Sequence, residues 1–245
     1  MAAPGQPCWI DITVNSADDR ERLVAFLCDL FDWTFEASGP EVGYYTMLRR
    51  NGVDVAAVGQ QPEGGGRWVT FFAAPDIEAS VASVTDNGGQ VFMGPHTVMR
   101  AGTLAVGVDP TGAVFGLWQP DLFAGFGETI AAGHPVWFDH GSPDPAAANG
   151  FYTSTFGLEA TAPDGDAMVG RDGRWYFSVS RNVAGNAPDI KPVIMVDDLD
   201  SLEDTVRAAG GEIHASAVEL PSGGRATTFA DPVVGAPLIA FSNSA

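Results

Sequence analysis

The two halves of this 245-residue chain carry the same landmarks in the same order, and this repeat constrains the fold more than any other feature. Each half opens on an apolar segment with a tryptophan and an aspartate, CWIDI around Trp9 and VWFD around Trp137. Each continues with an aromatic-rich segment, FLCDLFDW in the first half and FYTSTFG in the second. Further on, DNGG and DPTGA in the first half correspond to AAGG and DPVVGA in the second. Landmarks that recur in this order indicate a duplicated chain.

The repeat predicts two domains of similar fold. We place the first over residues 1–122 and the second over residues 134–245. The segment between them, residues 123–133, is rich in glycine and alanine, which is typical of a linker. Domains of this length are common in globular proteins.

Each half divides again into two similar modules. The first half starts with an expected strand, CWIDITV, then a helix over residues 17–30, then strands in WTFEA, GYYTMLRR and VDVAAVG. The cycle restarts at WVTFFAA, with a helix over residues 76–85 capped by Asp76. In the second half, helices are expected to begin near Asp144 and Asp198. The pattern therefore predicts an α+β chain in which a strand–helix–three-strand module, βαβββ, occurs four times.

These segments, together with the endings DPTGAVFGLWQP and DPVVGAPLIAF, resemble the vicinal oxygen chelate superfamily, which includes glyoxalases, bleomycin-resistance proteins and extradiol dioxygenases. The resemblance covers the whole chain and is strongest to tandem two-domain actinobacterial proteins of the glyoxalase-like type. It implies that the four modules pair into two glyoxalase-like domains, each with a curved mixed sheet around a cleft. It implies less about function, because the superfamily holds isomerases, dioxygenases, thiol transferases, epimerases and non-enzymatic drug binders.

The resemblance also bears on metal binding. Members that use a metal take His, Glu or Gln from first strands and a Glu near the end of the last strand. These positions correspond here to Trp9 and Trp137 on first strands, and to Gly116 and Ala240 on last strands. None of these side chains coordinates a metal ion. No histidine recurs at a matching repeat position; the histidines are His96, His134, His140 and His214. We therefore predict no catalytic metal and no cofactor.

Strand alternation places one aromatic ring and one carboxylate in each expected cleft. If Ile10 faces the helices, Trp9 and Asp11 face the cleft, and the same alternation pairs Trp137 with Asp139. The functional interpretation is a stacking surface beside an aspartate that acts as hydrogen-bond acceptor or general base. Desolvation by the indole would raise the pKa of this aspartate. The structural alternative is that each indole fills its cleft and each aspartate accepts a backbone hydrogen bond.

Further side chains are expected to border the clefts, although a core role is the alternative for each. They are Tyr44, Met47, Trp68, Phe72 and Trp118 in the first domain, and Trp175 and Tyr176 in the second. So many flat rings would suit an aromatic or polycyclic small molecule. His214 lies on a strand that could border the second cleft and is a third acid–base candidate, after Asp11 and Asp139.

Composition excludes some partners and leaves two functions open. The chain has 31 acidic and 12 basic residues, a net charge of −19, which disfavours nucleic acid. Neither a membrane-spanning run nor a signal peptide is visible, so we expect a cytoplasmic protein that is a monomer with two pseudo-equivalent domains or a homodimer. The first hypothesis is a metal-free binding protein of secondary metabolism, for natural-product sequestration or antibiotic self-resistance. The second is a metal-independent isomerase, lyase or cyclase that uses a cleft aspartate, so whether the chain is an enzyme stays open.

Overall fold

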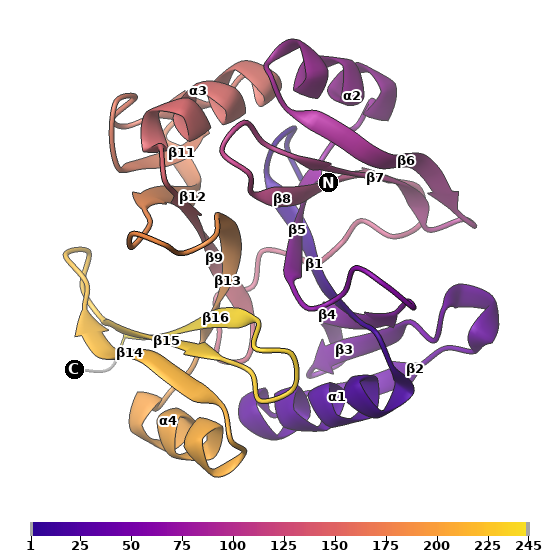
Figure 1. Cartoon of the computed structure of the whole chain (residues 1–245), viewed down its shortest axis with the longest axis vertical. Helices are drawn as coiled ribbons and strands as arrows, with labels where there is room; N and C mark the ends of the chain where they lie inside the picture. Colours follow the sequence, from indigo (N-terminus) through magenta and orange to yellow (C-terminus); the bar gives the residue numbers. More distant parts are fainter. Residues whose placement is uncertain (1, 244–245) are drawn as a thin grey trace. The chain divides into compact units, whose positions relative to one another are not determined.

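The chain forms four successive βαβββ modules, as the computed structural model shows for residues 2–243 (Figure 1). The first comprises β1 (Pro7–Val14), α1 (Ala17–Phe31), β2 (Thr34–Ala37), the short 3-10 helix η1 (Pro40–Val42), β3 (Thr46–Arg50) and β4 (Val53–Gln60). The second comprises β5 (Trp68–Ala73), α2 (Ile77–Asp86), β6 (Gln90–Val98), β7 (Gly102–Val108) and β8 (Val114–Pro120). The third comprises β9 (Pro135–Ser142), α3 (Pro145–Phe156), β10 (Glu159–Ala160), β11 (Ala167–Arg171) and β12 (Arg174–Arg181). The fourth comprises β13 (Asp189–Met195), α4 (Leu199–Ala208), β14 (Glu212–Glu219), β15 (Arg225–Ala230) and β16 (Pro237–Ser242).

The strands form two eight-stranded mixed sheets with the same topology. The first has the order β2-β3-β4-β1-β5-β8-β7-β6, and the second the order β10-β11-β12-β9-β13-β16-β15-β14. The second order is the first with every strand number raised by eight. The predicted α+β class and the predicted repeat of four modules are therefore confirmed.

The predicted helix starts are also confirmed, because acidic or hydroxyl side chains cap them. Asp76 Oδ1 accepts a hydrogen bond from the Ala79 amide, and Asp144 Oδ1 accepts one from the Ala147 amide. Asp198 Oδ1 accepts from two amides at the start of α4, and Ser16 Oγ accepts from the Asp19 amide at the start of α1. These bonds satisfy amides that have no partner inside the helix.

The two DP-containing repeat landmarks are turns organised by their aspartates. Asp231 accepts hydrogen bonds from the amides of Val233, Val234 and Ala236. Asp109 likewise accepts from the amides of two residues that follow it in the DPTGA turn. Each half needs such a turn before its last strand, and this explains why the DP motif occurs twice.

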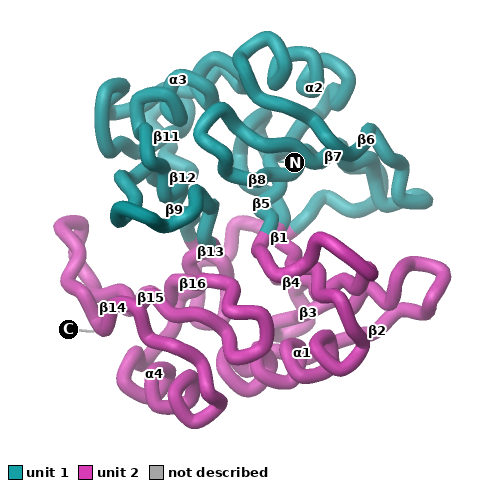
Figure 2. The backbone as a smooth tube through the Cα atoms, viewed as in Figure 1, with its two compact units in different colours: residues 1–9, 69–125, 137–191 teal, residues 10–68, 126–136, 192–245 magenta. Residues whose placement is uncertain are grey.

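The backbone contacts divide the chain into two compact units (Figure 2). Unit 1 contains residues 1–9, 69–125 and 137–191, and unit 2 contains residues 10–68, 126–136 and 192–245. Unit 1 thus holds most of the second and third modules, and unit 2 most of the first and fourth. The sheets, in contrast, each combine two successive modules. The predicted linker over residues 123–133 stays a prediction.

The core of unit 1 is aromatic and draws on both halves of the sequence. The Phe72 ring is fully buried, and its centroid lies 5.4 Å from that of Tyr152 and 5.5 Å from that of Phe177. Phe115 and Phe156 pack against the same ring at 6.1 and 5.6 Å. Ring pairs of this kind contribute about 0.5–1.5 kcal/mol each beyond the burial of apolar area.

A buried polar trio lies beside this aromatic core. His140 Nε2 is 2.8 Å from Asp109 Oδ2, and the Tyr152 hydroxyl donates to the same oxygen at 3.3 Å. Burial would raise the pKa of Asp109, but the hydrogen bond and charge of His140, with the turn amides, hold it below its usual value. The trio is fully buried, so it stabilises unit 1 and is closed to solvent.

Unit 2 has an aliphatic core on one face of its strands. Ile10 and Ile12 of β1 are fully buried, as are Leu23 and Leu27 of α1, whereas Asp11 between the two isoleucines is only half-buried. This alternation is the one predicted from the sequence. In α4, Glu203 is buried and accepts hydrogen bonds from the hydroxyls of Ser216 and Thr227 and from Arg207.

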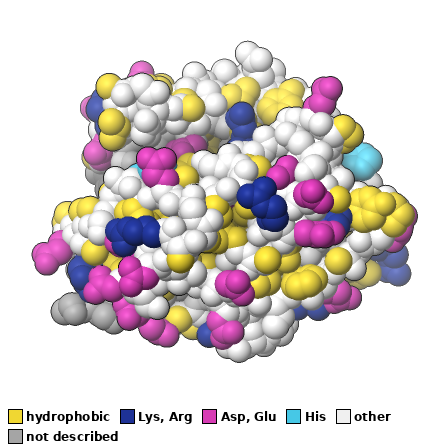
Figure 3. Space-filling view, turned by 60° about the horizontal axis from the view of Figure 1, so that its bottom comes forward, with side chains coloured by type: hydrophobic (Ala, Val, Ile, Leu, Met, Phe, Trp, Pro, Cys, Tyr) yellow, Lys and Arg dark blue, Asp and Glu magenta, His cyan; other side chains and the backbone are white. Residues whose placement is uncertain are grey.

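No helix in residues 2–243 has both the length and the apolar character needed to span a membrane. On the face drawn in Figure 3, acidic side chains lie scattered among apolar and uncharged ones.

Candidate functional site

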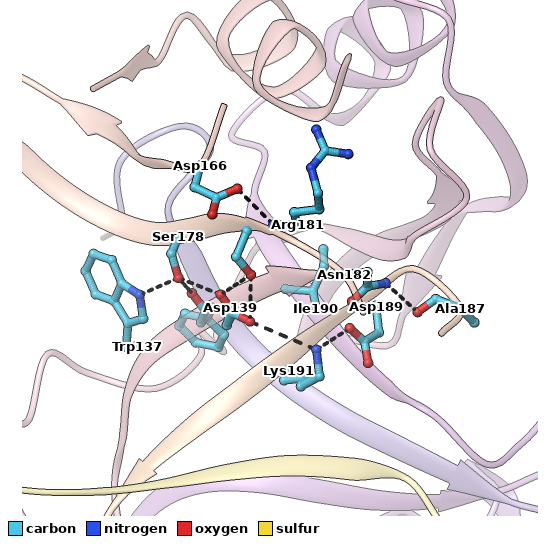
Figure 4. Close-up of polar contacts among 12 residues, drawn as sticks. Trp137, Asp139, Asp166, Ser178, Arg181, Asn182, Ala187, Asp189, Ile190 and Lys191 are labelled. Atoms are coloured by element: carbon cyan, nitrogen blue, oxygen red, sulfur yellow. Dashed lines mark hydrogen bonds and ion pairs between the residues drawn. The ribbon is translucent and has the colours of Figure 1, made fainter. Parts of the chain in front are cut away.

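The second sheet carries a connected group of polar side chains around Asp139, all within unit 1 (Figure 4). Parallel pairing of β9 with β12 places Asp139 opposite Ser178, with Ser180 two residues further along the same face. Ser178 Oγ donates to Asp139 Oδ1 at 2.8 Å, and Ser180 Oγ lies 3.0 and 3.2 Å from the two carboxylate oxygens. Trp137 Nε1 donates to Ser178 Oγ at 3.1 Å. The indole and the carboxylate that the sequence paired are therefore joined through a serine hydroxyl.

Lys191 of β13 extends this group to a second carboxylate. Its Nζ lies 2.6 Å from Asp189 Oδ1 and 4.0 Å from Asp139 Oδ2, and its side chain is 14% exposed. Burial raises the pKa of Asp189 although the Lys191 ammonium lowers it, and the nearby Asp139 charge raises it further. The group holds two carboxylates and one ammonium.

A β-bulge brings one more aromatic side chain to the face of Ser178. Val169 of β11 lies opposite Phe177, but the next residue, Gly170, lies opposite Trp175, so Tyr176 is an extra residue in β12. Trp175 therefore shares the face of Ser178, whereas Phe177 points into the buried core. Both Trp175 and Tyr176 are half-buried, which leaves them accessible beside Trp137 and Asp139 on this sheet.

The corresponding group in the first sheet is smaller and lies in unit 2. The Tyr45 hydroxyl donates to Asp11 Oδ2 at 3.0 Å. Met47 lies opposite Ala57, which lies opposite Asp11, so the predicted Met47 shares the Asp11 face. Burial raises the pKa of Asp11 to about 7, and the Tyr45 hydrogen bond offsets only part of that rise. A carboxyl group with this pKa can both donate and accept a proton near neutral pH.

Trp9 is covered by a ring from its own chain, whereas Trp137 is not. The Phe123 ring packs edge-on against Trp9 with centroids 4.8 Å apart, and against Trp118 at 6.1 Å. Trp118 Nε1 donates to the Phe123 carbonyl at 2.8 Å. Trp9 and Trp118 are thus buried. Trp137 is half-buried, and no ring of residues 2–243 packs against it.

The remaining predicted residues lie elsewhere. Tyr44 is 41% exposed and stacks under the Arg20 guanidinium, whereas the next residue, Tyr45, reaches Asp11. Phe72 lies in the aromatic core, on the opposite face of β5 from the position that pairs with Trp118. His214 is exposed on the edge strand β14, 3.9 Å from Glu212.

Trp68 is a buried residue at the start of β5, and its indole N–H has no acceptor within residues 2–243. Cys8, in contrast, behaves as an ordinary core thiol, because burial raises its pKa to about 12.

Sequence analysis missed the residues that surround the two aspartates, namely Tyr45, Ser178, Ser180, Lys191 and Asp189. One signal could have identified Lys191, because it is the only lysine in the chain. The others follow from strand register, which a single sequence does not display.

The positions at which relatives would hold a metal ion do not fit one here. A Cβ atom placed on Gly116 would collide with the Phe71 ring, so apolar atoms fill the space of a last-strand ligand. Counting from Ala113 and Ala236, which hold equivalent places in the DP turns, the partner of Gly116 in the second half is Ile239, and not Ala240 as the sequence comparison placed it. Neither isoleucine nor the first-strand tryptophans can bind a metal. Within residues 2–243, no group of three or more His, Cys, Asp or Glu side chains is arranged to hold one.

Comparisons with known proteins agree with this architecture. No family model matches the sequence. The chain is 30% identical over 243 residues to the "Putative glyoxylase CFP32" of Mycobacterium tuberculosis, covering 93% of this chain and 91% of that protein. It is 32% identical over 252 residues to the anthracycline biosynthesis protein DauV of Streptomyces sp. strain C5, covering 91% and 89%.

Solved structures share the fold at low sequence identity. The Mn(II)-bound glyoxalase of Novosphingobium aromaticivorans superposes with a TM-score of 0.68 at 17% identity, covering 99% of this chain and 83% of that one. The 2,2',3-trihydroxybiphenyl 1,2-dioxygenase of Sphingomonas wittichii gives 0.67 at 14% identity, covering 98% and 91%.

Proposed function

The chain belongs to the glyoxalase-like proteins of the vicinal oxygen chelate superfamily, and we propose that it is a metal-independent binding protein of secondary metabolism. Its ligand is an aromatic small molecule that stacks on Trp137. The observation that carries this proposal is the contrast between Trp9, which Phe123 covers, and Trp137, which is half-buried with no ring of residues 2–243 against it. A half-buried indole that no ring of residues 2–243 covers, and that lies beside polar groups, offers a surface on which a flat ligand can stack.

Two further observations support the proposal. The relatives DauV and DnrV are named as anthracycline biosynthesis proteins, which favours a role in natural-product metabolism, such as sequestration or self-resistance. The side chains at the positions of the family's metal ligands, Gly116 and Ile239 among them, favour binding without a metal ion.

Asp11 favours a second candidate, a metal-independent isomerase, lyase or cyclase. Burial raises its pKa to about 7, so it can exchange a proton near neutral pH, and Tyr45 is placed to hold the carboxyl group in orientation. Turnover of a candidate natural product by EDTA-treated protein, lost in Asp11→Asn, would favour the enzyme over the binding protein.

The binding proposal is tested with alizarin (1,2-dihydroxyanthraquinone) as a visible probe. Trp137→Ala removes the stacking contact, about 1 kcal/mol, and the apolar area buried by the ligand, so affinity falls at least about tenfold. The matched control is Trp9→Ala at the equivalent repeat position. It lowers the free energy of unfolding by about 3–5 kcal/mol, as expected for a buried ring, and leaves alizarin affinity within about twofold. Equal affinity of Trp137→Ala and the parent protein in titration calorimetry would overturn the proposal.

A further inference from the structure

Lys191 is unusual both in the sequence and in its surroundings. It is the only lysine among 245 residues, in a chain with 31 acidic side chains. Lysines normally lie in solvent, yet this side chain is only 14% exposed and lies between two carboxylates. Its position beside the Asp139 group calls for a reason other than solubility.

We propose that the Lys191 ammonium binds an oxygen atom of the ligand that stacks on Trp137, which makes the ligand an aromatic ketone, quinone or phenol. This inference rests on the proposed function, because it assigns the polar contact of the same site. Lys191 is then the residue that selects oxygenated rings over plain hydrocarbons.

Lys191 is connected to the Trp137 indole, the proposed stacking surface. Trp137 donates to Ser178, Ser178 donates to Asp139, and Asp139 lies 4.0 Å from Lys191 Nζ (Figure 4). Asp189 holds the other side of the ammonium at 2.6 Å. The ammonium is therefore held by Asp189 and linked to the indole through Asp139 and Ser178.

Most hydrogen-bond donors around Asp139 already have an acceptor, which limits those that a ligand could use. Trp137 Nε1 is already bound to Ser178, and the Ser178 and Ser180 hydroxyls are directed at Asp139. An ammonium has three N–H groups, and Lys191 donates a hydrogen bond to Asp189 Oδ1 at 2.6 Å, whereas Asp139 Oδ2, at 4.0 Å, is an ion-pair partner beyond hydrogen-bond distance. Within residues 2–243, Lys191 therefore keeps N–H groups that can donate to a ligand, and their complement is an acceptor oxygen.

The charge of the group around Lys191 limits which ligands it can bind. Asp139, Asp189 and Lys191 together carry one excess negative charge when all are ionised. This charge repels ligands with a carboxylate or phosphate group. A neutral carbonyl or phenolic oxygen takes the ammonium donor without that penalty, and hydrogen bonds to charged donors are stronger than those between neutral groups.

The test uses two probes of equal shape, 2-acetylnaphthalene and 2-ethylnaphthalene, which differ in one carbonyl group. We expect the parent protein to prefer the ketone. Lys191→Met should weaken ketone binding about tenfold and leave hydrocarbon binding nearly unchanged, because the hydrocarbon makes no hydrogen bond with the ammonium that is removed. Lys191→Arg keeps a charged donor and should retain part of the preference. Arg181→Met is the matched control, since it removes a positive charge from β12, which β9 separates from β13, and Arg181 donates to the Pro143 carbonyl and not to Asp139.

The outcomes separate the two proposals. If Lys191→Met weakens both probes equally, or neither, the inference about Lys191 is wrong while binding at Trp137 stands. If the parent binds neither probe, nor alizarin, the proposed function fails and the inference with it. Circular dichroism and melting curves check that each variant folds.

A measurement on the unmodified protein avoids the question of folding. Acetylation of the single lysine is followed by mass spectrometry of the peptide that contains it. Saturating 2-acetylnaphthalene should slow acetylation of Lys191 at least fivefold, whereas 2-ethylnaphthalene at equal occupancy should slow it less. Equal protection by both probes would contradict a contact between the ammonium and the carbonyl oxygen.

Discussion

At the residue scale, Asp11 and Asp139 show how neighbours set the chemistry of one side chain. Both follow a tryptophan by two residues on the first strand of a half. Asp139 accepts hydrogen bonds from Ser178 and Ser180 and lies 4.0 Å from the Lys191 ammonium. Asp11 is hydrogen-bonded by Tyr45, and burial dominates its pKa. Asp11 is therefore suited to proton exchange, and Asp139 to fixed polar contacts.

The raised pKa of Asp11 predicts how stability depends on pH. Its folded-state pKa of about 7 exceeds the usual value of about 3.9 for an unfolded aspartate. Between these values the folded state holds the proton and the unfolded state has lost it, so this group's contribution to the unfolding free energy falls as pH rises. Asp11→Asn removes this loss. The stability of the variant relative to the parent should increase between pH 4 and 7, by at most about 1.4 kcal/mol per pH unit.

Urea unfolding of both proteins at pH 5 and pH 8 measures this difference. Tyr45→Phe is the matched control, because it removes the hydrogen bond that favours the charged form and should extend the loss of stability to higher pH. A difference between Asp11→Asn and the parent that is the same at both pH values would show that Asp11 titrates normally.

At the element scale, the segment over residues 121–125 covers two tryptophans of the first half, Trp9 and Trp118. The amides of Asp121 and Phe123 both donate to the Ala101 carbonyl, which holds the segment against the end of β7. Gly125 has a φ of +86° and passes so close to the Cys8 carbonyl that a Cβ atom could not be accommodated. Residues 123–125 of this segment also begin the predicted linker over residues 123–133.

Removing the cover should expose the rings beneath it. Phe123→Ala deletes the ring that packs on Trp9 and Trp118, so acrylamide should quench tryptophan fluorescence more strongly, and alizarin should gain a second binding equivalent. Leu122→Ala is the matched control, because Leu122 is 68% exposed. Unchanged quenching and stoichiometry in Phe123→Ala would show that the segment does not block a binding surface.

At the scale of the whole molecule, each compact unit is built from modules that are far apart in sequence. Unit 1 combines residues 69–125 with residues 137–191 around Phe72 and Tyr152. The sheets follow sequence order, so each half of the chain contributes to both units. Neither half alone contains a complete core for unit 1.

A chain cut in the connecting segment should therefore stay together. With a protease site inserted between Gly127 and Ile130, we expect the two fragments to co-elute after cleavage, because the Phe72 and Phe115 rings would lose buried area if the fragments parted. They should also unfold in one transition at a lower urea concentration than the uncut chain, since the loop no longer tethers them. Size-exclusion chromatography measures this, and two separate folded fragments would contradict it.

The sequence by itself determined the fold because the signals involved are local. The alternation of Ile10, Asp11 and Ile12, and the caps at Asp76 and Asp198, depend on neighbours in the chain. The recurrence of Trp9 as Trp137 showed that the chain has two similar halves. Similar local signals recur in the same order within each half, and this gave the four modules.

Only the tertiary structure decided which side chains meet. Tyr45 reaches Asp11 because β3 pairs with β4 and β4 with β1, and Trp175 shares the Ser178 face because of a bulge. Phe123 covers Trp9, and Lys191 lies beside Asp139, across 114 and 52 positions of sequence, respectively. A shift of one residue moves a side chain to the other face of a strand, and only the pairing with neighbouring strands reveals it.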